Sequence, residues 1–162
     1  MNLEDIGIRL AVATLIGCMI GLNRFAHHRF IGVRTLGLVS LGAAALVVAA
    51  LETGSGNDQL AAASRIIQGI VTGIGFIGAG VIVQGERGHK VHGLTTAATV
   101  WVSAVAGILC GVGAWRVTAI VTVLVGVVLL AGGPIEELLV RRSGSHAEGE
   151  HPAPQKGATP EP

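Results

Sequence analysis

The chain has 162 residues, of which 51% are hydrophobic and only 13% carry a charged side chain, and its mean hydropathy is +0.68. Charged residues make up about 25% of an ordinary soluble domain, so this chain has too little polar surface to cover a soluble globule. The formal net charge of +1 is uninformative by itself. The composition therefore predicts a protein of the lipid bilayer, with no nucleic-acid partner.

The first hydrophobic run, Ile6 to Leu22, contains one charged residue, Arg9. Arg9 is near the end of the run, where a long cationic side chain can reach the membrane interface. Asp5 precedes Arg9 by four residues, a spacing at which two side chains on a helix can pair. We expect a first transmembrane helix that begins with this pair.

Four further runs contain no charged residue. A helix rises about 1.5 Å per residue, so 19 residues span about 28 Å, close to the thickness of the hydrocarbon core. These runs predict an all-α, polytopic membrane bundle of five transmembrane helices over residues 1–142. Residues 143–162 have the composition of a disordered tail. The four runs are Thr35–Leu51, Ile66–Gln84, Leu94–Trp115 and Val117–Ile135.

The third run contains G-x-G-x-x-G at Gly73, Gly75 and Gly78. The dinucleotide-binding fingerprint needs a preceding strand and an acidic residue about 20 positions later, and neither is found here. Small residues instead let two helices approach closely in lipid. We therefore predict helix packing through Gly69, Gly73, Gly75, Gly78 and Gly80, either within the chain or in a homodimer.

Small residues recur at a spacing of four in two other runs. Gly17 and Gly21 form such a pair in the first run. The fourth run carries a longer stripe of small or weakly polar residues, which we expect to face the third helix. This stripe consists of Thr95, Thr99, Ser103, Gly107 and Gly111.

Basic residues alternate between the connections. The first connection contains three arginines, the second only Arg65, the third Arg87 and Lys90, and the fourth only Arg116, whereas two arginines follow the fifth run. Because cytoplasmic loops are enriched in Lys and Arg, the N-terminus is predicted outside and the C-terminus in the cytoplasm.

From about Arg9 to Gly113 the sequence resembles the MgtC/SapB family of bacterial inner-membrane proteins. The resemblance rests on GLNR at 21–24, GVRT at 32–35, Arg65-Ile66 with Gln68, VTGIGFIGAGVI at 71–82 and HGLTTAATVW at 92–101. It implies a multi-pass protein of the bacterial inner (plasma) membrane that is linked to survival at low Mg²⁺ and, in pathogens, to virulence inside host cells. It also implies restraint of the proton-driven ATP synthase, with a membrane subunit of that enzyme as partner.

The sequence departs from the family pattern at two motif positions. Asn23 replaces the usual acid of Gly-Leu-Glu-Arg, and His92 replaces the usual Arg before Gly-Leu. The resemblance therefore carries no ion pair between those two loops to this chain. Many family members continue into a soluble cytoplasmic domain, and we expect a short form without it.

Polar residues near the helix ends form a candidate pocket or partner contact. Arg34 and Arg65 are predicted at the starts of the second and third helices, with Gln68 and Thr72 just inside the third. Thr95 is predicted either to cap the fourth helix or to join Gln68 in a polar pocket. The full candidate set is Asn23, Arg24, Arg34, Arg65, Gln68, Thr72, His92, Thr95 and Thr96.

The spans contain no carboxylate and no histidine for acid–base chemistry, so no enzyme activity, catalytic residue or cofactor is predicted. No metal site is predicted either, because Mg²⁺ usually takes at least one carboxylate ligand and the acids lie in the N-terminal segment and the loops. We therefore expect a protein that acts by contact with a partner in the membrane. The alternative is a transporter of Mg²⁺ or another small solute.

Overall fold

A computed structural model describes residues 1–26, 32–54, 57–83 and 93–144 of the chain. These residues form helices and their short connections, with no strand among them. The helices are α1 (Leu3–Ala26), α2 (Val33–Thr53), α3 (Asn57–Val83), α4 (Leu94–Val112) and α5 (Trp115–Gly144). All five are long and apolar enough to cross a membrane, which confirms the predicted all-α fold with five transmembrane helices.

The chain divides into two compact units, Met1–Gly126 and Val127–Pro162. Helix α5 begins in the first unit and continues into the second, where it extends two residues beyond the predicted tail boundary, to Gly144. The rest of the predicted tail, residues 145–162, lies outside the described residues.

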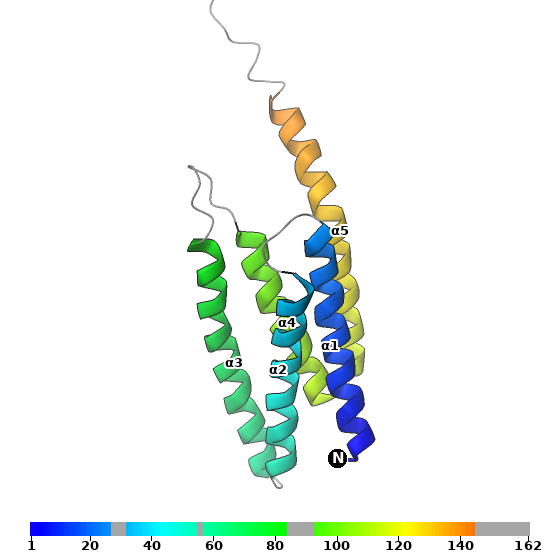
Figure 1. The fold of residues 1–162 in the computed structure, drawn as a ribbon, viewed down its shortest axis with the longest axis vertical. Helices are drawn as coiled ribbons and strands as arrows, with labels where there is room; N and C mark the ends of the chain where they lie inside the picture. Colours follow the sequence, from blue (N-terminus) through cyan, green and yellow to red (C-terminus); the bar gives the residue numbers. More distant parts are fainter. Residues whose placement is uncertain (27–31, 55–56, 84–92, 145–162) are drawn as a thin grey trace, which may run out of the picture. The chain divides into compact units, whose positions relative to one another are not determined.

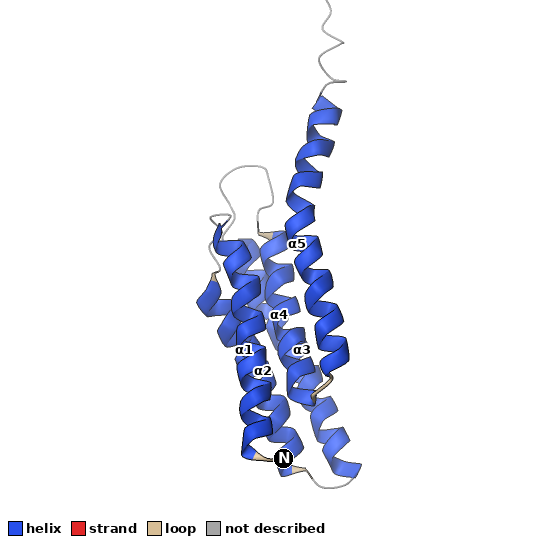
Figure 2. Cartoon of the chain, turned by 90° about the vertical axis from the view of Figure 1, so that its right-hand side faces the viewer, coloured by secondary structure: helices blue, strands red, loops and turns tan. Residues whose placement is uncertain are grey.

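In the first unit, α2 and α4 form the centre of the helix arrangement. Helix α4 contacts α1, α2 and α3, and α2 contacts α1, α3 and α4. Helices α1 and α3 lie on opposite sides of the α2–α4 pair (Figure 1), and successive helices among these four run antiparallel (Figure 2). Because α4 is enclosed on three sides, its span is 56% buried, whereas the span of α3 is only 6% buried.

Helix α3 begins earlier than its uncharged run predicts. It starts at Asn57, nine residues before Ile66, and therefore includes Asp58 and Arg65. Counting only uncharged residues underestimates a membrane helix, because charged side chains in its end turns can still reach the headgroup region. As a consequence, Gln68 is the eleventh residue of the 25-residue span Asp58–Ile82 and lies close to the middle of that span.

The end of α4 is fixed by Gly113. This residue has φ +81°, in the left-handed region that glycine adopts without steric cost. Its N–H donates to the carbonyl oxygens of Leu109 and Cys110, and the N–H of Ala114 also donates to Leu109. These hydrogen bonds satisfy carbonyls that would otherwise lack a partner and allow α5 to start at Trp115.

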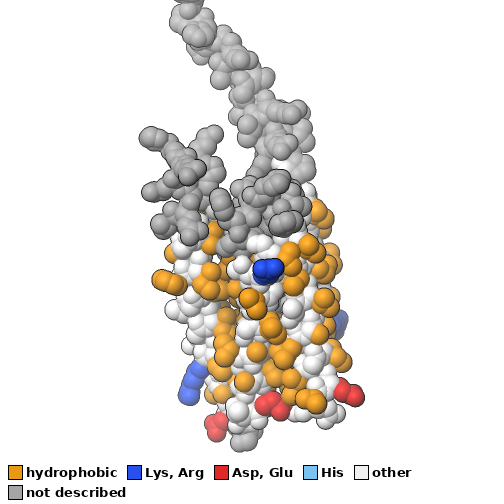
Figure 3. Space-filling model, in the orientation of Figure 1, with side chains coloured by type: hydrophobic (Ala, Val, Ile, Leu, Met, Phe, Trp, Pro, Cys, Tyr) orange, Lys and Arg blue, Asp and Glu red, His pale blue; other side chains and the backbone are white. Residues whose placement is uncertain are grey.

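Apolar side chains cover much of the middle of the molecule on the face shown in Figure 3, and acidic side chains gather at one end. That end carries the N-termini of α1 and α3 and the C-terminus of α2, and it contains Glu4, Asp5, Glu52 and Asp58. An apolar belt with charges at its edge is the surface that a bilayer requires.

Candidate functional site

The core of the first unit is built where glycines let α1, α2 and α4 come into backbone contact. A β-carbon on Gly17 of α1 would lie 2.5 Å from the carbonyl oxygen of Leu36 in α2. On the other side of α2, a β-carbon on Gly107 of α4 would collide with the carbonyl oxygen of Ser40. The backbones of three helices therefore approach so closely that side chains larger than hydrogen do not fit at these points.

Two further glycines extend this close packing toward the ends of the helices. A β-carbon on Gly21 would lie 2.6 Å from Cα of Val33, and one on Gly111 would lie 2.9 Å from the carbonyl oxygen of Ala44. The structure therefore places Gly17, Gly21, Gly107 and Gly111 at helix contacts within the chain.

Two buried serines link the same three helices. The hydroxyl of Ser40 in α2 donates to the carbonyl oxygen of Ala13 in α1 at 2.7 Å. The hydroxyl of Ser103 in α4 donates to the carbonyl oxygen of Leu36 in α2 at 2.8 Å. Both serines are fully buried. Ser40 was missed in the sequence, although it is the only polar residue of the run Thr35–Leu51 besides Thr35 at its start.

The stripe on α4 faces α2, and the expectation that it faces α3 is wrong. Ser103 bonds to Leu36, Gly107 contacts Ser40 and Ala43, and Gly111 contacts Ala44 and Val47, all residues of α2. The close contact needs small residues on both partners, and α2 offers Ser40, Ala43 and Ala44 there. Thr99 is buried in the same stripe and donates to the carbonyl oxygen of Thr96 at 2.7 Å.

Arg9 connects α1 to the end of α4. Its Nε donates to Oδ2 of Asp5 at 3.1 Å, which confirms the predicted pair. One guanidinium nitrogen also donates to the carbonyl oxygen of Gly111 at 2.8 Å. A cation at the C-terminus of a helix stabilises its unpaired carbonyls. The sequence showed the pair but not the contact with Gly111, which joins residues 102 positions apart.

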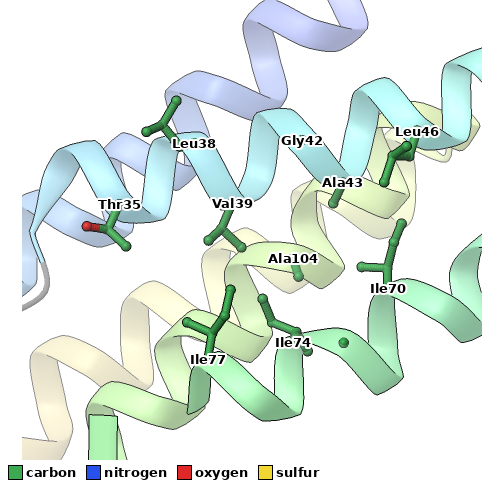
Figure 4. Close-up of a pocket in the computed structure, with 11 residues that line it drawn as sticks. Thr35, Leu38, Val39, Gly42, Ala43, Leu46, Ile70, Ile74, Ile77 and Ala104 are labelled. Carbon is green, nitrogen blue, oxygen red and sulfur yellow. The ribbon is translucent and has the colours of Figure 1, made fainter. Parts of the chain in front are cut away.

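An open apolar groove of about 480 Å³ lies between α2 and α3. Leu38, Val39 and Leu46 come from α2, whereas Ile70, Ile74 and Ile77 come from α3, and Ala104 of α4 lies between the two walls (Figure 4). Gly42 and Gly73 also line it, and a β-carbon on either would meet no atom within 4 Å. A transmembrane helix of a partner could approach these two glycines closely.

The glycines of α3 do not make the helix contacts that their counterparts in α1 and α4 make. A β-carbon on Gly69, Gly73, Gly75 or Gly80 would meet no described atom within 4 Å, and one on Gly78 would only reach Cβ of Ala97, at 3.8 Å. Within the described part of the chain these residues leave open space. Packing through them remains a prediction.

Gln68 and Thr95 do not form a common pocket. A β-carbon on Gly93 would lie 2.8 Å from the carbonyl oxygen of Val81, so the start of α4 is next to the end of α3. Val81 is 13 residues beyond Gln68, a separation of about 20 Å along a helix. Thr95 is exposed, and no side chain caps α4 at Gly93. The antiparallel arrangement therefore separates the two residues.

The remaining polar candidates are distributed over both ends of the bundle. Arg34 is exposed in the first turn of α2, as expected, and Arg65 is exposed two turns inside α3. Asn23 is half-buried near the end of α1 and Thr96 is buried in α4. The side chain of Arg24 and the whole of His92 lie outside the described residues.

Potential metal ligands are dispersed in the part of the chain that the structure describes. No group of three or more His, Cys, Asp or Glu residues comes together there. The described helices therefore offer close packing at glycines, hydrogen bonds from buried hydroxyls and an open apolar surface.

The sequence model of the MgtC family matches residues 10–138 of this chain. Protein SrpB of Synechococcus elongatus is 40% identical over 126 residues, which cover 72% of this chain and 69% of that protein. Protein MgtC of Brucella abortus is 42% identical over 131 residues, covering 80% and 52%, and protein MgtC of Salmonella typhimurium is 40% identical over 118 residues, covering 73% and 48%.

The chain thus spans about half the length of the MgtC proteins that it matches. No solved structure matches the chain. The matched region covers the five apolar helices except the first seven residues of α1 and the last six of α5, and it includes the glycine contacts of α1 and α4. This chain is a multi-pass membrane protein and belongs to the MgtC family.

Proposed function

We propose that this protein acts in the bacterial inner membrane by contact with a membrane subunit of the ATP synthase, and that this contact restrains the enzyme during adaptation to low Mg²⁺. In this proposal the protein is not an enzyme and its work is done by helix surfaces. Family membership supports a role of the MgtC type, and the arrangement of the helices supports a contact mechanism.

The closed core of α1, α2 and α4 is the observation on which the contact mechanism rests. Gly17 and Gly107 bring backbones together on both sides of α2, and Ser40 and Ser103 use their hydroxyls to bond helices to each other. A path for a hydrated cation needs polar or carboxylate groups that face a cavity. In the described part of the core, these polar groups are instead engaged in joining the helices.

The groove between α2 and α3 is the proposed contact surface. Its apolar walls and its open glycines, Gly42 and Gly73, suit a transmembrane helix of the ATP synthase membrane subunit. Because lipid tails are as apolar as the groove, a partner helix gains little free energy from apolar contact alone. Its association is favoured by the close backbone approach that the glycines allow.

The test is ATP-driven proton pumping in inverted inner-membrane vesicles, with and without this protein at matched amounts of ATP synthase. The protein is expected to reduce pumping, and Gly73→Leu, which fills the groove, is expected to restore it. Gly126→Leu is the matched control, because Gly126 also faces open space but lies in α5, outside the groove.

Unchanged pumping in the presence of the wild-type protein would contradict the proposal. Equal effects of Gly73→Leu and Gly126→Leu would contradict the assignment of the groove. In the first case, Mg²⁺ flux into proteoliposomes that contain the purified chain would test the alternative of a solute transporter.

A further inference from the structure

We propose that this protein forms a parallel homodimer in the membrane through the outward side of α3. This surface, called here the outer α3 face, consists of Ser64, Gln68, Gly69, Thr72, Phe76 and Ala79, all exposed in the single chain. At about 100° per residue these positions fall within one side of the helix. The inference does not rest on the proposed contact with the ATP synthase.

The outer α3 face is rich in small and polar residues, whereas a surface in contact with lipid is rich in large apolar side chains. The aliphatic residues of α3, such as Ile70, Ile74 and Ile77, line the groove on the side toward α2. The opposite side carries an amide, two hydroxyls, glycine and alanine, with Phe76 as a single large apolar side chain.

The other helices of the same molecule provide the comparison. They expose large apolar side chains, for example Leu15 of α1 at 62%, Leu38 of α2 at 67% and Ile120 of α5 at 61% exposure, although α2 also exposes Gly42, Ala45 and Ala49. Those faces suit lipid tails. The outer α3 face departs from this pattern, since Phe76, 85% exposed, is its only large apolar side chain.

Gln68 makes this face costly to leave in lipid. It lies close to the middle of the apolar span Asp58–Ile82, and its Nε2 has the hydroxyl of Ser64 at 3.4 Å as a long hydrogen-bond partner. A primary amide has two donors and a carbonyl acceptor, so one contact of this length leaves most of its capacity unused. An unsatisfied amide in hydrocarbon costs several kcal/mol, and a second polar surface removes that cost.

A second copy of this chain fits the face because the face is complementary to itself. Both copies insert into the membrane in the same orientation, so two α3 helices related by a two-fold axis along the membrane normal are parallel and meet at equal depth. Two Gln68 amides at equal depth can each donate to the carbonyl oxygen of the other. Gly69 and Ala79 allow the close approach that this exchange requires.

Charge at the end of the face is also balanced in such a pair. Asp58 and Arg65 precede Phe76 by 18 and 11 residues, about five and three helical turns, so both lie on the side of the outer α3 face. Each copy therefore places one acid and one base near the N-terminal end of α3 in the dimer contact. The long Arg65 side chain can extend toward the lipid headgroups and the acids at that end. A different partner would have to supply a matching polar group at the depth of Gln68.

Disulfide cross-linking of the full chain in native membranes tests the dimer. The native Cys18 and Cys110 are replaced by alanine, and single cysteines are introduced at Thr72 and Ala79 on the outer α3 face. Oxidation is expected to link both variants into dimers. The controls Leu15→Cys in α1 and Ile120→Cys in α5 are at positions that are also exposed in the single chain, and they are expected to stay monomeric. Equal linkage at all four positions would overturn the proposal.

Photobleaching step counts of the labelled chain with its native cysteines, in vesicles of decreasing protein-to-lipid ratio, provide a second test that does not depend on the cysteine background. Gln68→Leu is expected to weaken the dimer about five- to thirtyfold, and Gln68→Asn to retain part of it. The control Met19→Leu on the exposed side of α1 should leave it unchanged. Single-step bleaching of the wild type at every ratio would overturn the proposal.

Discussion

At the scale of single residues, the glycines of this protein differ in function although they share the same spacing. Gly107 is enclosed by α2, whereas Gly69 and Gly73 have no described atom within reach of a β-carbon. The sequence shows the same four-residue interval in both helices. The difference follows from which side of each helix meets a neighbour in the chain.

We predict that Gly107→Ala lowers the free energy of unfolding by about 1–3 kcal/mol, because the added methyl group collides with the backbone of α2 at Ser40 and must displace it. The measurement is an SDS titration in mixed micelles, followed by circular dichroism. Gly126→Ala is the control, because its methyl group meets open space and alanine favours the helix. Equal losses for both variants would contradict the packing described for Gly107.

Some contacts between residues could be predicted from the sequence and others could not. Arg9 and Asp5 could be paired from their spacing, because a helix brings positions four apart together whatever surrounds it. The contact of Arg9 with Gly111 could not be predicted, since it depends on which helix end lies beside α1 in three dimensions. Gly17 and Gly107 were predicted as packing residues, but their partners in α2 were not.

At the scale of helices, the number and type of elements could be predicted because a bilayer imposes a length and an apolar composition on every span. The start of α3 could not be predicted, because Asp58 and Arg65 end the uncharged run although the helix continues through them. The prediction that the α4 stripe contacts α3 was also wrong. Sequence neighbours are a reasonable first choice, but the small residues of α2 permit closer contact than the isoleucines of α3.

The structure predicts that Arg9 stabilises the C-terminal end of α4. Arg9→Leu removes the hydrogen bond to the carbonyl oxygen of Gly111 and the pair with Asp5. The loss is expected to be about 1–3 kcal/mol, as for other hydrogen bonds to charged groups. Hydrogen exchange should increase in the last turn of α4 and around Gly113, where Arg9 lies against the chain.

Arg116→Leu is the matched control for that experiment. Arg116 is also an arginine near the junction of α4 and α5, but its side chain is exposed. Its replacement is expected to leave both the stability and the exchange of α4 unchanged. If the two variants behave alike, the Arg9 contact contributes no specific stabilisation of the helix end.

At the scale of the whole molecule, the described charges differ between the two ends of the helix arrangement in the first unit. Glu4, Asp5, Glu52 and Asp58 lie at the end that holds the start of α1. Arg9 and Arg116 are near the same end and Arg65 is two turns inside α3, whereas Arg34 lies at the opposite end, in the first turn of α2. Basic residues near the ends of spans are retained on the cytoplasmic side during insertion. In the sequence, the connections α1–α2 and α3–α4, at the end with Arg34, also contain or adjoin Arg24, Arg29, Arg87 and Lys90. That end is therefore predicted to face the cytoplasm, and the end with the four acids to face away from it.

Reporter fusions test this orientation. Alkaline phosphatase, which folds only after export, is expected to be active when it is inserted at Gly54, between α2 and α3, and inactive when it is fused after Arg142 near the end of α5. A fluorescent protein that folds in the cytoplasm should give the reverse pattern at the same two positions. Activity of the phosphatase at Arg142 would place the acidic end in the cytoplasm. The outer α3 face would still be parallel in a dimer, because the two copies would share the inverted orientation, but Asp58 and Arg65 would then lie near the cytoplasmic leaflet.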